Sequence, residues 1–304
     1  MSSKKVVIIG ANSFLGRNLI EELRQSSFDL TLFARNQADS FKDYAFEIFN
    51  YPQNPLDFNK VIKADVIIYA VGAGVQASLK ESSELIFQLN AFLPISLLNF
   101  LQENKFQGKI VTFGSYFELG NKAEAKAYSE DELVSINTLV PNHYCGSKRL
   151  LTRFIGNGLL TINYYHLILP TIYGPGENQS RLIPYVVNQL INKLPLTLTS
   201  GEQSRAYLYV KDLCRLLEEF ITEDFAPGIY NVAAAEQLQV KSLVQLISLN
   251  LNLPLNFTAN AAIRNDVAMK HLELNAVKLS KATTWKPKKR ITDIIHLYKK
   301  DKIA

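Results

Sequence analysis

The stretch "KVVIIGANSFLGRNLIEELRQS", residues 5–26, joins an apolar run to an amphipathic pattern through a turn that contains Gly10 and Gly16. The apolar run has the length of a buried strand, and the segment after it carries apolar side chains at helical spacing. Glycine suits the tight turn that ends such a strand, and a helix N-terminus directly after it binds phosphate groups. Ser13 stands where such turns usually have a middle glycine, but serine is small and a good N-cap. The stretch therefore predicts a strand, a dinucleotide-binding turn and a helix.

The same alternation of apolar strands and helical patterns continues along the first half of the chain. Further strands are expected at residues 29–35, 45–50, 64–72, 108–115 and 162–170. Helices are expected at 83–104, where Pro94 should introduce a kink, and from about Asn142. Near-continuous apolar strands separated by helices indicate an α/β fold with a doubly wound parallel sheet. This order also favours a binding role for the first turn over an ordinary strand-to-helix connection.

After Pro170 the pattern becomes less regular. A Gly/Pro turn, a helix, a short strand, a second helix, a strand and a third helix follow one another at residues 171–179, 181–194, 195–201, 210–222, 228–234 and from 240. We interpret residues 1–170 as a dinucleotide-binding domain that is completed by about 206–233. Residues 171–205 and 234–304 are then expected to form a smaller mixed α/β C-terminal lobe that binds substrate.

Composition excludes several classes of protein. The chain has 304 residues, of which 47% are hydrophobic and 20% charged, as in ordinary globular proteins. Its net charge of +5 is modest, and the lysines near the C-terminus indicate a solvated surface, so no nucleic-acid partner is expected. Two cysteines and four histidines have neither a disulfide framework nor metal-ligand spacing, so no metal is expected. The N-terminus lacks a signal-peptide pattern, and no uniformly apolar run approaches the roughly 18 residues of a membrane span, which predicts a cytoplasmic protein without membrane association.

The choice of cofactor can be inferred from the end of the second expected strand. Ala34, Arg35 and Asn36 follow one another there, and no acid precedes Asp39. An NAD site usually has an acid at this position for the ribose 2′-hydroxyl, whereas an arginine can hold the 2′-phosphate of NADP by a bidentate contact. The alternative is an arginine that simply faces solvent at a strand end. The residues favour NADP(H), with NAD(H) possible.

The pattern Tyr-x-x-x-Lys occurs three times, at Tyr144/Lys148, Tyr207/Lys211 and Tyr298/Lys302. The first pair follows the fifth expected strand and opens a helix at the edge of the sheet where ligands bind. Residues four apart lie on one helical face, and a nearby ammonium is expected to lower the pKa of a tyrosine from about 10. Such a tyrosine can exchange a proton with a carbonyl or alcohol.

Ser115 lies at the end of the fifth expected strand, in "TFGSYFELG", 29 residues before Tyr144. A hydroxyl at that place can hydrogen-bond a substrate oxygen as the oxygen gains charge. A lone serine at a strand end is usually a turn residue, and its position beside the Tyr144/Lys148 pair makes it a candidate.

The motifs "GANSFLG", "FGSYFELG", "YCGSK", "IYGPGEN", "RAYLYVKD" and "WKP" together resemble the extended short-chain dehydrogenase/reductase superfamily, in the sugar-nucleotide branch of its NAD-dependent epimerase/dehydratase family. The resemblance extends along nearly the whole chain and implies a Rossmann sheet with Ser115, Tyr144 and Lys148 as the catalytic triad. It implies that Asn90 helps to order the catalytic lysine. It also implies two sets of binding residues: Gly10, Asn12, Ser13, Phe14, Leu15, Gly16, Arg35, Ala70, Val71, Gly72, Asn90, Tyr144, Lys148, Pro170 and Thr171 for the cofactor, and Ser115, Tyr116, Arg205 and Arg264 for the substrate.

Three activities compete within this branch. A 4,6-dehydratase usually carries Asp-Glu directly after the catalytic serine or threonine, whereas Tyr116 and Phe117 follow Ser115 here. An epimerase commonly retains NAD, whereas a 4-ketoreductase exchanges NADPH, which Arg35 favours. The segments "YGPGENQSRLIPY", "TSGEQSR" and "TWKP" resemble 4-ketoreductases of the CDP-abequose synthase kind. That resemblance implies NADPH-dependent reduction of the 4-keto group of a CDP- or dTDP-4-keto-6-deoxyhexose, in deoxysugar biosynthesis such as that for lipopolysaccharide O-antigen.

Two alternatives remain open at this point: an NAD-dependent nucleotide-sugar epimerase, and a non-catalytic NADP-binding sensor on the same fold. The resemblance further implies a homodimer that forms through the helices near 83–104 and 142–157.

Overall fold

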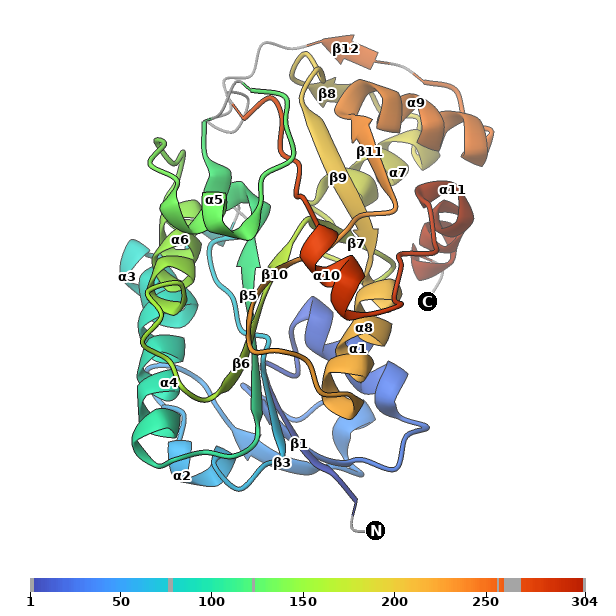
Figure 1. Cartoon of the computed structure of the whole chain (residues 1–304). Helices are drawn as coiled ribbons and strands as arrows, with labels where there is room; N and C mark the ends of the chain where they lie inside the picture. Colours follow the sequence, from blue (N-terminus) through green and yellow to red (C-terminus); the bar gives the residue numbers. More distant parts are fainter. Residues whose placement is uncertain (1–2, 76–78, 122–123, 256, 260–268, 303–304) are drawn as a thin grey trace.

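The computed structural model describes residues 3–75, 79–121, 124–255, 257–259 and 269–302. Its centre is a parallel sheet of seven strands in the order β10-β6-β5-β4-β1-β2-β3 (Figure 1). The strands are β1 (Lys5–Ile9), β2 (Asp29–Ala34), β3 (Ala45–Ile48), β4 (Val66–Tyr69), β5 (Lys109–Ser115), β6 (Asn163–Leu169) and β10 (Gly228–Asn231). The predicted α/β fold with a doubly wound parallel sheet is confirmed.

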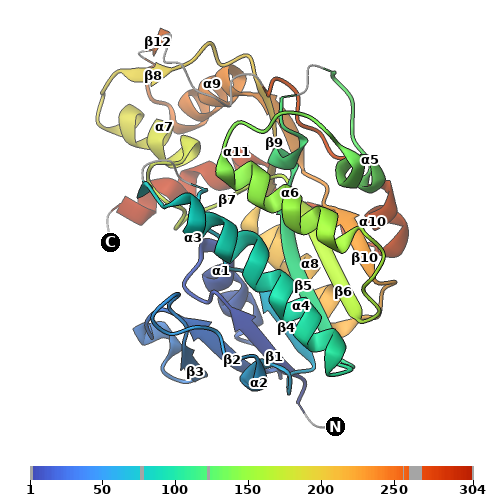
Figure 2. The same ribbon diagram turned by 90° about the vertical axis from the view of Figure 1, so that its left-hand side faces the viewer.

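Helices cover both faces of the sheet, which explains why its central strands are apolar on both sides. Every residue of β4 and β5 is buried. Helices α1 (Phe14–Leu23) and α8 (Val210–Thr222) pack side by side on one face, and α4 (Leu93–Glu103) and α6 (His143–Ile155) cover the other (Figures 1 and 2). The sheet therefore lies between two hydrophobic layers. Its order reverses between β1 and β4, and in such sheets ligands bind at that reversal, beyond the carboxyl ends of the strands.

The long helix before β5 has three parts. Helix α3 (Ser83–Phe87) runs into a π-helical turn, η3 (Gln88–Phe92), and then into α4. Pro94 is the second residue of α4, so the irregularity that we expected at the proline lies in the turn just before it. By length and mean hydropathy (1.4), Ser83–Glu103 could also cross a membrane, a property that our sequence reading missed. Because this segment packs against α6 and is partly buried, we assign it to the core.

A smaller lobe lies beyond the carboxyl edge of the large sheet (Figure 1). It contains a three-stranded sheet and a two-stranded sheet, with helices packed around a third hydrophobic cluster. The elements are β7 (Thr171–Tyr173), α7 (Leu182–Ile191), β8 (Leu196–Leu198), β9 (Ser204–Tyr209), β11 (Glu236–Gln239), α9 (Val240–Leu251), β12 (Phe257–Ala259), α11 (Ile291–Ile294) and η6 (Ile295–Lys302). Within the segment 206–233, which we expected to complete the first domain, β10 pairs with β6 in the large sheet, whereas β9 pairs with β7 and β11.

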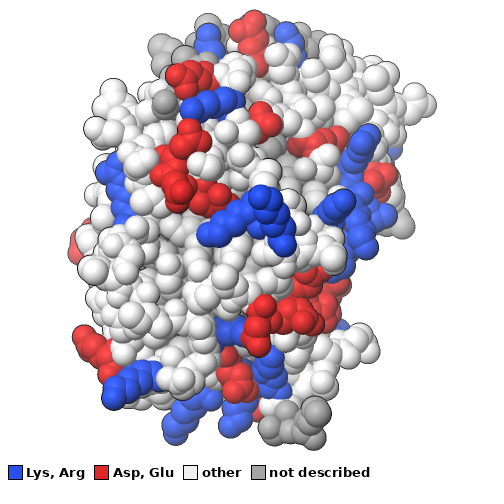
Figure 3. Space-filling model, viewed as in Figure 1, with Lys and Arg blue, Asp and Glu red and all other residues white. Residues whose placement is uncertain are grey.

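Five short elements connect these layers: η1 (Asp39–Phe41), α2 (Phe58–Val61), η4 (Tyr116–Leu119), α5 (Glu130–Ser135) and α10 (Val277–Ala282). On the face drawn in Figure 3, basic and acidic side chains are interspersed.

The C-terminal region is anchored to the rest of the protein at two points. The Trp285 indole donates to the carbonyl oxygen of Asp212 over 2.9 Å, and the Asp212 carboxylate accepts from the backbone of Lys288 and Lys289. The Tyr298 hydroxyl hydrogen-bonds the buried Glu177 carboxylate. Lys286, Lys288 and Lys289 are exposed, as expected for the C-terminal lysines, whereas Trp285 and Tyr298 are buried in hydrophobic clusters.

Candidate active site

The turn after β1 has the shape that a dinucleotide site requires. Gly10 has φ +93°, and its N–H donates to the Phe33 carbonyl oxygen over 2.8 Å. A Cβ at Gly10 would lie 2.9 Å from the backbone of Ala70, and one at Gly16 would lie 2.4 Å from the carbonyl oxygen of Gly10. Both positions therefore need glycine. Ser13 is the N-cap of α1, and its hydroxyl accepts from the Gly16 N–H over 2.9 Å.

These features fit a nicotinamide dinucleotide. The turn brings the N-terminus of a ten-residue helix to the point where the strand order reverses, which suits a pyrophosphate. Asn12 donates through Nδ2 to the carbonyl and side-chain oxygens of Asn36, both over 2.9 Å. Its own Oδ1 is buried and has no hydrogen-bond partner among the described residues, so it is a candidate for a ligand contact. Phe14 and Leu15 pack into the core behind the turn.

Arg35 lies directly after β2 and is exposed. Because β2 neighbours β1 in the sheet, Arg35 lies at the same edge as the glycine turn. Arg17, which the sequence reading did not single out, donates to the carbonyl oxygens of Asn12 (2.6 Å) and Gly176 (3.0 Å). Arg17 thus ties the turn to the small lobe.

Asn90 connects the segment after β4 to α6. Ala70, Val71 and Gly72, which we predicted to line a cofactor, follow this strand. In η3, the Asn90 side chain donates to the carbonyl oxygen of Ala73 (2.8 Å) and accepts from its N–H (2.9 Å). The Asn90 amide also donates to the Ser147 hydroxyl over 2.9 Å. Asn90 therefore orders the residue before Lys148, through a connection that no local sequence pattern reveals.

The structure brings Ser115 and Tyr144 together. Ser115 ends β5, and Tyr144 and Lys148 lie in the first two turns of α6, which Asn142 caps through its side chain. A hydrogen bond between Ser115 and Tyr144 favours the ionised form of the tyrosine, but burial outweighs it and raises the pKa of Tyr144 to about 12. Our prediction of a lowered tyrosine pKa is thus wrong for the protein without ligands. Lys148 Nζ instead donates to the Phe113 carbonyl oxygen over 2.9 Å.

A group of buried polar side chains lies behind these three residues. The Glu118 carboxylate accepts from the Ser115 N–H over 2.6 Å, and His166 bridges the hydroxyls of Thr112 (2.8 Å) and Thr152 (2.9 Å). Burial raises the pKa of Glu118 to about 7, lowers the pKa of Lys148 to about 8 and lowers the pKa of His166 to about 3. The sequence reading missed Glu118, although its three-residue spacing from Ser115 is a capping-box pattern that could have revealed it.

Of the predicted substrate residues, Arg205 lies in the small lobe and Tyr116 contacts it. Arg205 on β9 is 6% exposed, donates to the carbonyl oxygens of Ser204 (2.8 Å) and Met269 (2.7 Å), and lies 5.7 Å from the centre of the Phe117 ring. The Tyr116 side chain is fully buried, and its hydroxyl shares a 2.6 Å hydrogen bond with Thr171.

The other predicted residues are accounted for as follows. Pro170 lies buried between β6 and β7, and Arg264 lies outside the described residues. Of the remaining Tyr-x-x-x-Lys pairs, Tyr207 is buried on β9, and Lys211 on α8 forms an ion pair with Glu21. Within the described part of the chain, no three His, Cys, Asp or Glu side chains are arranged to hold a metal ion.

The profile of the "NAD dependent epimerase/dehydratase family" matches residues 6–233. CDP-abequose synthase of Salmonella muenchen is 21% identical over 254 residues, which cover 81% of this chain and 80% of that protein. The dTDP-4-dehydro-6-deoxyglucose reductase of Escherichia coli is 23% identical over 266 residues, covering 81% and 82%.

Among solved structures, the UDP-glucuronic acid 4-epimerase of Bacillus cereus, in complex with UDP-glucuronic acid and NAD, superposes with a TM-score of 0.82. It is 16% identical and covers 98% of this chain and 99% of its own, so this likeness establishes the fold alone.

Proposed function

The chain belongs to the NAD dependent epimerase/dehydratase family, and from that premise we propose that it reduces the 4-keto group of a CDP- or dTDP-linked 4-keto-6-deoxyhexose with NADPH. At the coarser level, it is an NAD(P)-dependent enzyme that modifies a nucleotide sugar. The observation that carries the proposal is the meeting of Ser115 and Tyr144, with Lys148 one turn further along α6, at the sheet edge that holds the glycine turn.

Two observations favour reduction over epimerisation. Arg35 is exposed at the end of β2 and suits the 2′-phosphate of NADP, which a reductase exchanges at each turnover. The matched relatives from Salmonella muenchen and Escherichia coli bear names that fit formation of a 6-deoxyhexose, and the second is named a reductase. The second candidate is an NAD-dependent epimerase, because the superposed Bacillus cereus epimerase contains NAD.

Each side chain of the proposed triad has its own role at the substrate. Bound NADPH would supply a hydride to the carbonyl carbon. Tyr144 donates a proton to the oxygen, and its raised pKa keeps it protonated until that oxygen gains charge. Ser115 Oγ accepts from the Phe117 N–H, and its hydroxyl proton, which hydrogen-bonds Tyr144 in this structure, would be donated to the same substrate oxygen. The Lys148 ammonium favours negative charge nearby and can donate to ribose hydroxyls.

The residues beside Ser115 favour reduction over dehydration. Tyr116 and Phe117 occupy the two positions where dehydratases carry Asp-Glu. Glu118, the carboxylate of this turn, is fully buried and bound to the Ser115 N–H. It therefore does not face the substrate as a proton-transfer group.

We place the substrate between the large sheet and the small lobe. Arg205 offers a guanidinium fork that suits the diphosphate, and Arg264 is a second proposed contact. The Tyr116 and Thr171 hydroxyls, which hydrogen-bond each other over 2.6 Å, would lie beside the sugar and the nicotinamide.

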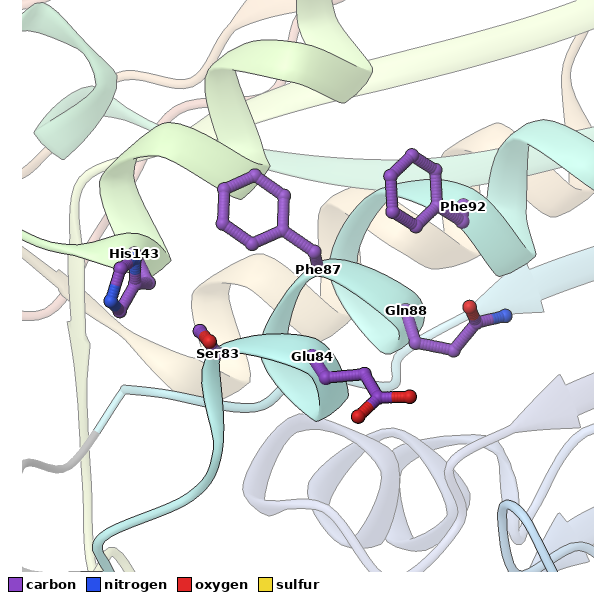
Figure 4. A pocket seen from close by; sticks show the side chains of 6 residues that line it. All are labelled: Ser83, Glu84, Phe87, Gln88, Phe92 and His143. Atoms are coloured by element: carbon purple, nitrogen blue, oxygen red, sulfur yellow. The ribbon is translucent and has the colours of Figure 1, made fainter.

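We further propose a cytoplasmic homodimer. Phe92 on η3 is 49% exposed and Leu150 on α6 is 37% exposed. Phe92 borders a surface hollow of about 380 Å³, which is lined by Ser83, Glu84, Phe87, Gln88, Phe92 and His143 (Figure 4). Helices α3 and α6 lie side by side, so the apolar side chains form one surface that suits an isologous interface (Figure 2).

Three assays separate the candidate functions. A reductase consumes NADPH in the presence of a CDP- or dTDP-4-keto-6-deoxyhexose, and failure with every such substrate contradicts the proposal. NAD⁺ that remains bound through purification, together with interconversion of nucleotide-sugar epimers, supports the epimerase instead. A non-catalytic sensor would bind NADPH and be indifferent to Tyr144→Phe.

A further inference from the structure

Glu118 has the environment of a functional group rather than of an ordinary turn residue. It is the third residue of the turn η4, its exposed fraction is 0%, and its carboxylate accepts from the Ser115 N–H over 2.6 Å. In return, the Ser115 hydroxyl accepts from the Phe117 N–H over 3.3 Å. This reciprocal pair fixes both the backbone and the side chain of Ser115.

The other carboxylate oxygen of Glu118, Oε2, is also buried, and a hydrogen bond from the Thr152 hydroxyl favours the ionised carboxylate. Burial of a carboxylate is costly and raises the pKa of Glu118 to about 7, and neighbouring hydrogen-bond donors and positive charges oppose this rise. Lys148 and Arg149 from α6 supply positive charge to Glu118. The Arg149 guanidinium donates to the backbone carbonyl oxygens of Glu118 and Thr138, and Lys148 Nζ donates to the carbonyl oxygen of Phe113, the residue before Gly114, beside which the Glu118 carboxylate lies.

The neighbouring strands leave room for this carboxylate. A Cβ at Gly114 would lie 2.8 Å from Glu118 Oε1 and 2.8 Å from His166 Nε2. Glycine at 114 therefore lets the two side chains lie beside β5. His166 comes from β6 and is held neutral by burial and by the Lys148 charge, which lower its pKa, so it adds no competing charge.

We propose that Glu118 is a positioning residue of the active site: its buried carboxylate holds the backbone of Ser115 and supplies the counter-charge that keeps Lys148 protonated. The same charge acts on Tyr144, whose pKa it raises. Glu118 therefore favours the proton-donating form of the tyrosine, as reduction requires.

The charges that face Glu118 define the sign of the expected effect. The carboxylate raises the pKa of both Lys148 and Tyr144, and Arg149 faces it from the same helix. Removing the negative charge lowers both pKa values. The pH at which Lys148 loses its proton then shifts downward, and activity at alkaline pH is lost earlier.

The first test measures Lys148 in the protein without nucleotide. Acetylation of Lys148 by acetic anhydride, followed by mass spectrometry across pH, reports the fraction of free amine. In Glu118→Gln the amide oxygen still accepts from the Ser115 N–H, but the charge is gone. We expect the labelling midpoint to fall by about one pH unit or more. An unchanged midpoint overturns the inference.

The second test rests on the proposed function and uses the pH dependence of kcat/KM. We expect its alkaline limb to shift downward by about one pH unit in Glu118→Gln. Glu118→Leu should lose about tenfold more in kcat, because the buried Ser115 N–H is left unpaired. If the wild type shows no turnover, the proposed function fails, and the labelling experiment still decides the role of Glu118.

A matched control is available in the same protein. Glu132 forms the same reciprocal pair with Ser129, at the start of α5, but its carboxylate pairs with Lys126. Glu132→Gln should leave both the labelling midpoint and the alkaline limb unchanged. Equal shifts in the two glutamine variants would show that Glu118 is merely structural and would overturn the proposal.

Discussion

The Asn90 side-chain amide donates a 2.9 Å hydrogen bond to the Ser147 hydroxyl, and this hydroxyl in turn donates to the backbone carbonyl oxygen of Tyr144 over 2.9 Å. The π-helical turn η3 is thereby attached to the first turn of α6. Because the contact is made by the backbone of Tyr144, it is kept when the tyrosine hydroxyl is removed. Removing that hydroxyl is therefore a clean test of proton transfer.

We expect Tyr144→Phe to lower kcat by about 10²- to 10⁴-fold, the usual contribution of general acid catalysis. NADPH binding, measured by fluorescence titration, should change less than about twofold, because Lys148 and the glycine turn are untouched. The thermal unfolding midpoint serves as the check on folding. Retention of more than a tenth of wild-type kcat would show that another group donates the proton.

The nucleotide-binding half of the site could be predicted from sequence because it is encoded locally. Gly10, Ser13 and Gly16 act through one strand-to-helix turn, and their spacing alone specifies its shape. Tyr144 and Lys148 are likewise one turn apart on a helix. Each of these features depends on residues within a few positions along the chain, where sequence patterns are informative.

The electrostatics of the site could not be predicted in the same way. We expected Lys148 to lower the pKa of Tyr144, but burial raises it, and burial depends on strands and helices far apart in sequence. The contacts of Asn90 with Ala73 and Ser147 also join distant segments. Glu118 had a local signal, the capping-box spacing, but its proximity to Lys148 becomes visible only when η4 packs on α6.

Arg35 provides the second prediction, on cofactor choice. Its guanidinium follows β2 and is exposed, beside the turn that would hold the pyrophosphate. Since a hydrogen bond to a charged group contributes about 1.5–3 kcal/mol, Arg35→Ala should weaken NADPH binding by about tenfold or more and leave NADH binding unchanged. Fluorescence titration with the two nucleotides measures this. Arg24→Ala, at the far end of α1, is the control; equal losses for both nucleotides would argue against a 2′-phosphate contact.

The third prediction concerns assembly. The Phe92 ring is exposed and lines the hollow in Figure 4. An aspartate carboxylate at this position would lose its hydration when a partner binds. Phe92→Asp should therefore convert a dimer into a monomer, as measured by light scattering after gel filtration. Leu249→Asp replaces a side chain on α9 that is also exposed, and it should leave the mass unchanged. A wild-type monomer at micromolar concentration, or a dimeric Phe92→Asp variant, would contradict this interface.

The fourth prediction concerns acid stability and the buried imidazole of His166. Burial lowers its pKa to about 3, whereas in the unfolded chain it is about 6.5, so the unfolded state binds more protons between these values. The stability that the neutral imidazole contributes is complete above pH 6.5 and is lost as the pH falls toward 3. At pH 4 the unfolded state of the wild type gains about 3 kcal/mol from protonation of this group.

Substitution of His166 by Asn removes the titrating group and leaves a side chain that can hydrogen-bond Thr112 or Thr152. We therefore expect the variant to be much less stable than the wild type at pH 7. At pH 4 the difference in unfolding free energy between the two proteins should be smaller by about 3 kcal/mol. Urea unfolding at the two pH values measures this change, and contributions of Glu118 and other carboxylates largely cancel between the two proteins. His296→Asn, at an exposed position on η6, should show the same difference from the wild type at both pH values. If the His166→Asn difference were also independent of pH, His166 would not be a neutral buried group that bridges Thr112 and Thr152.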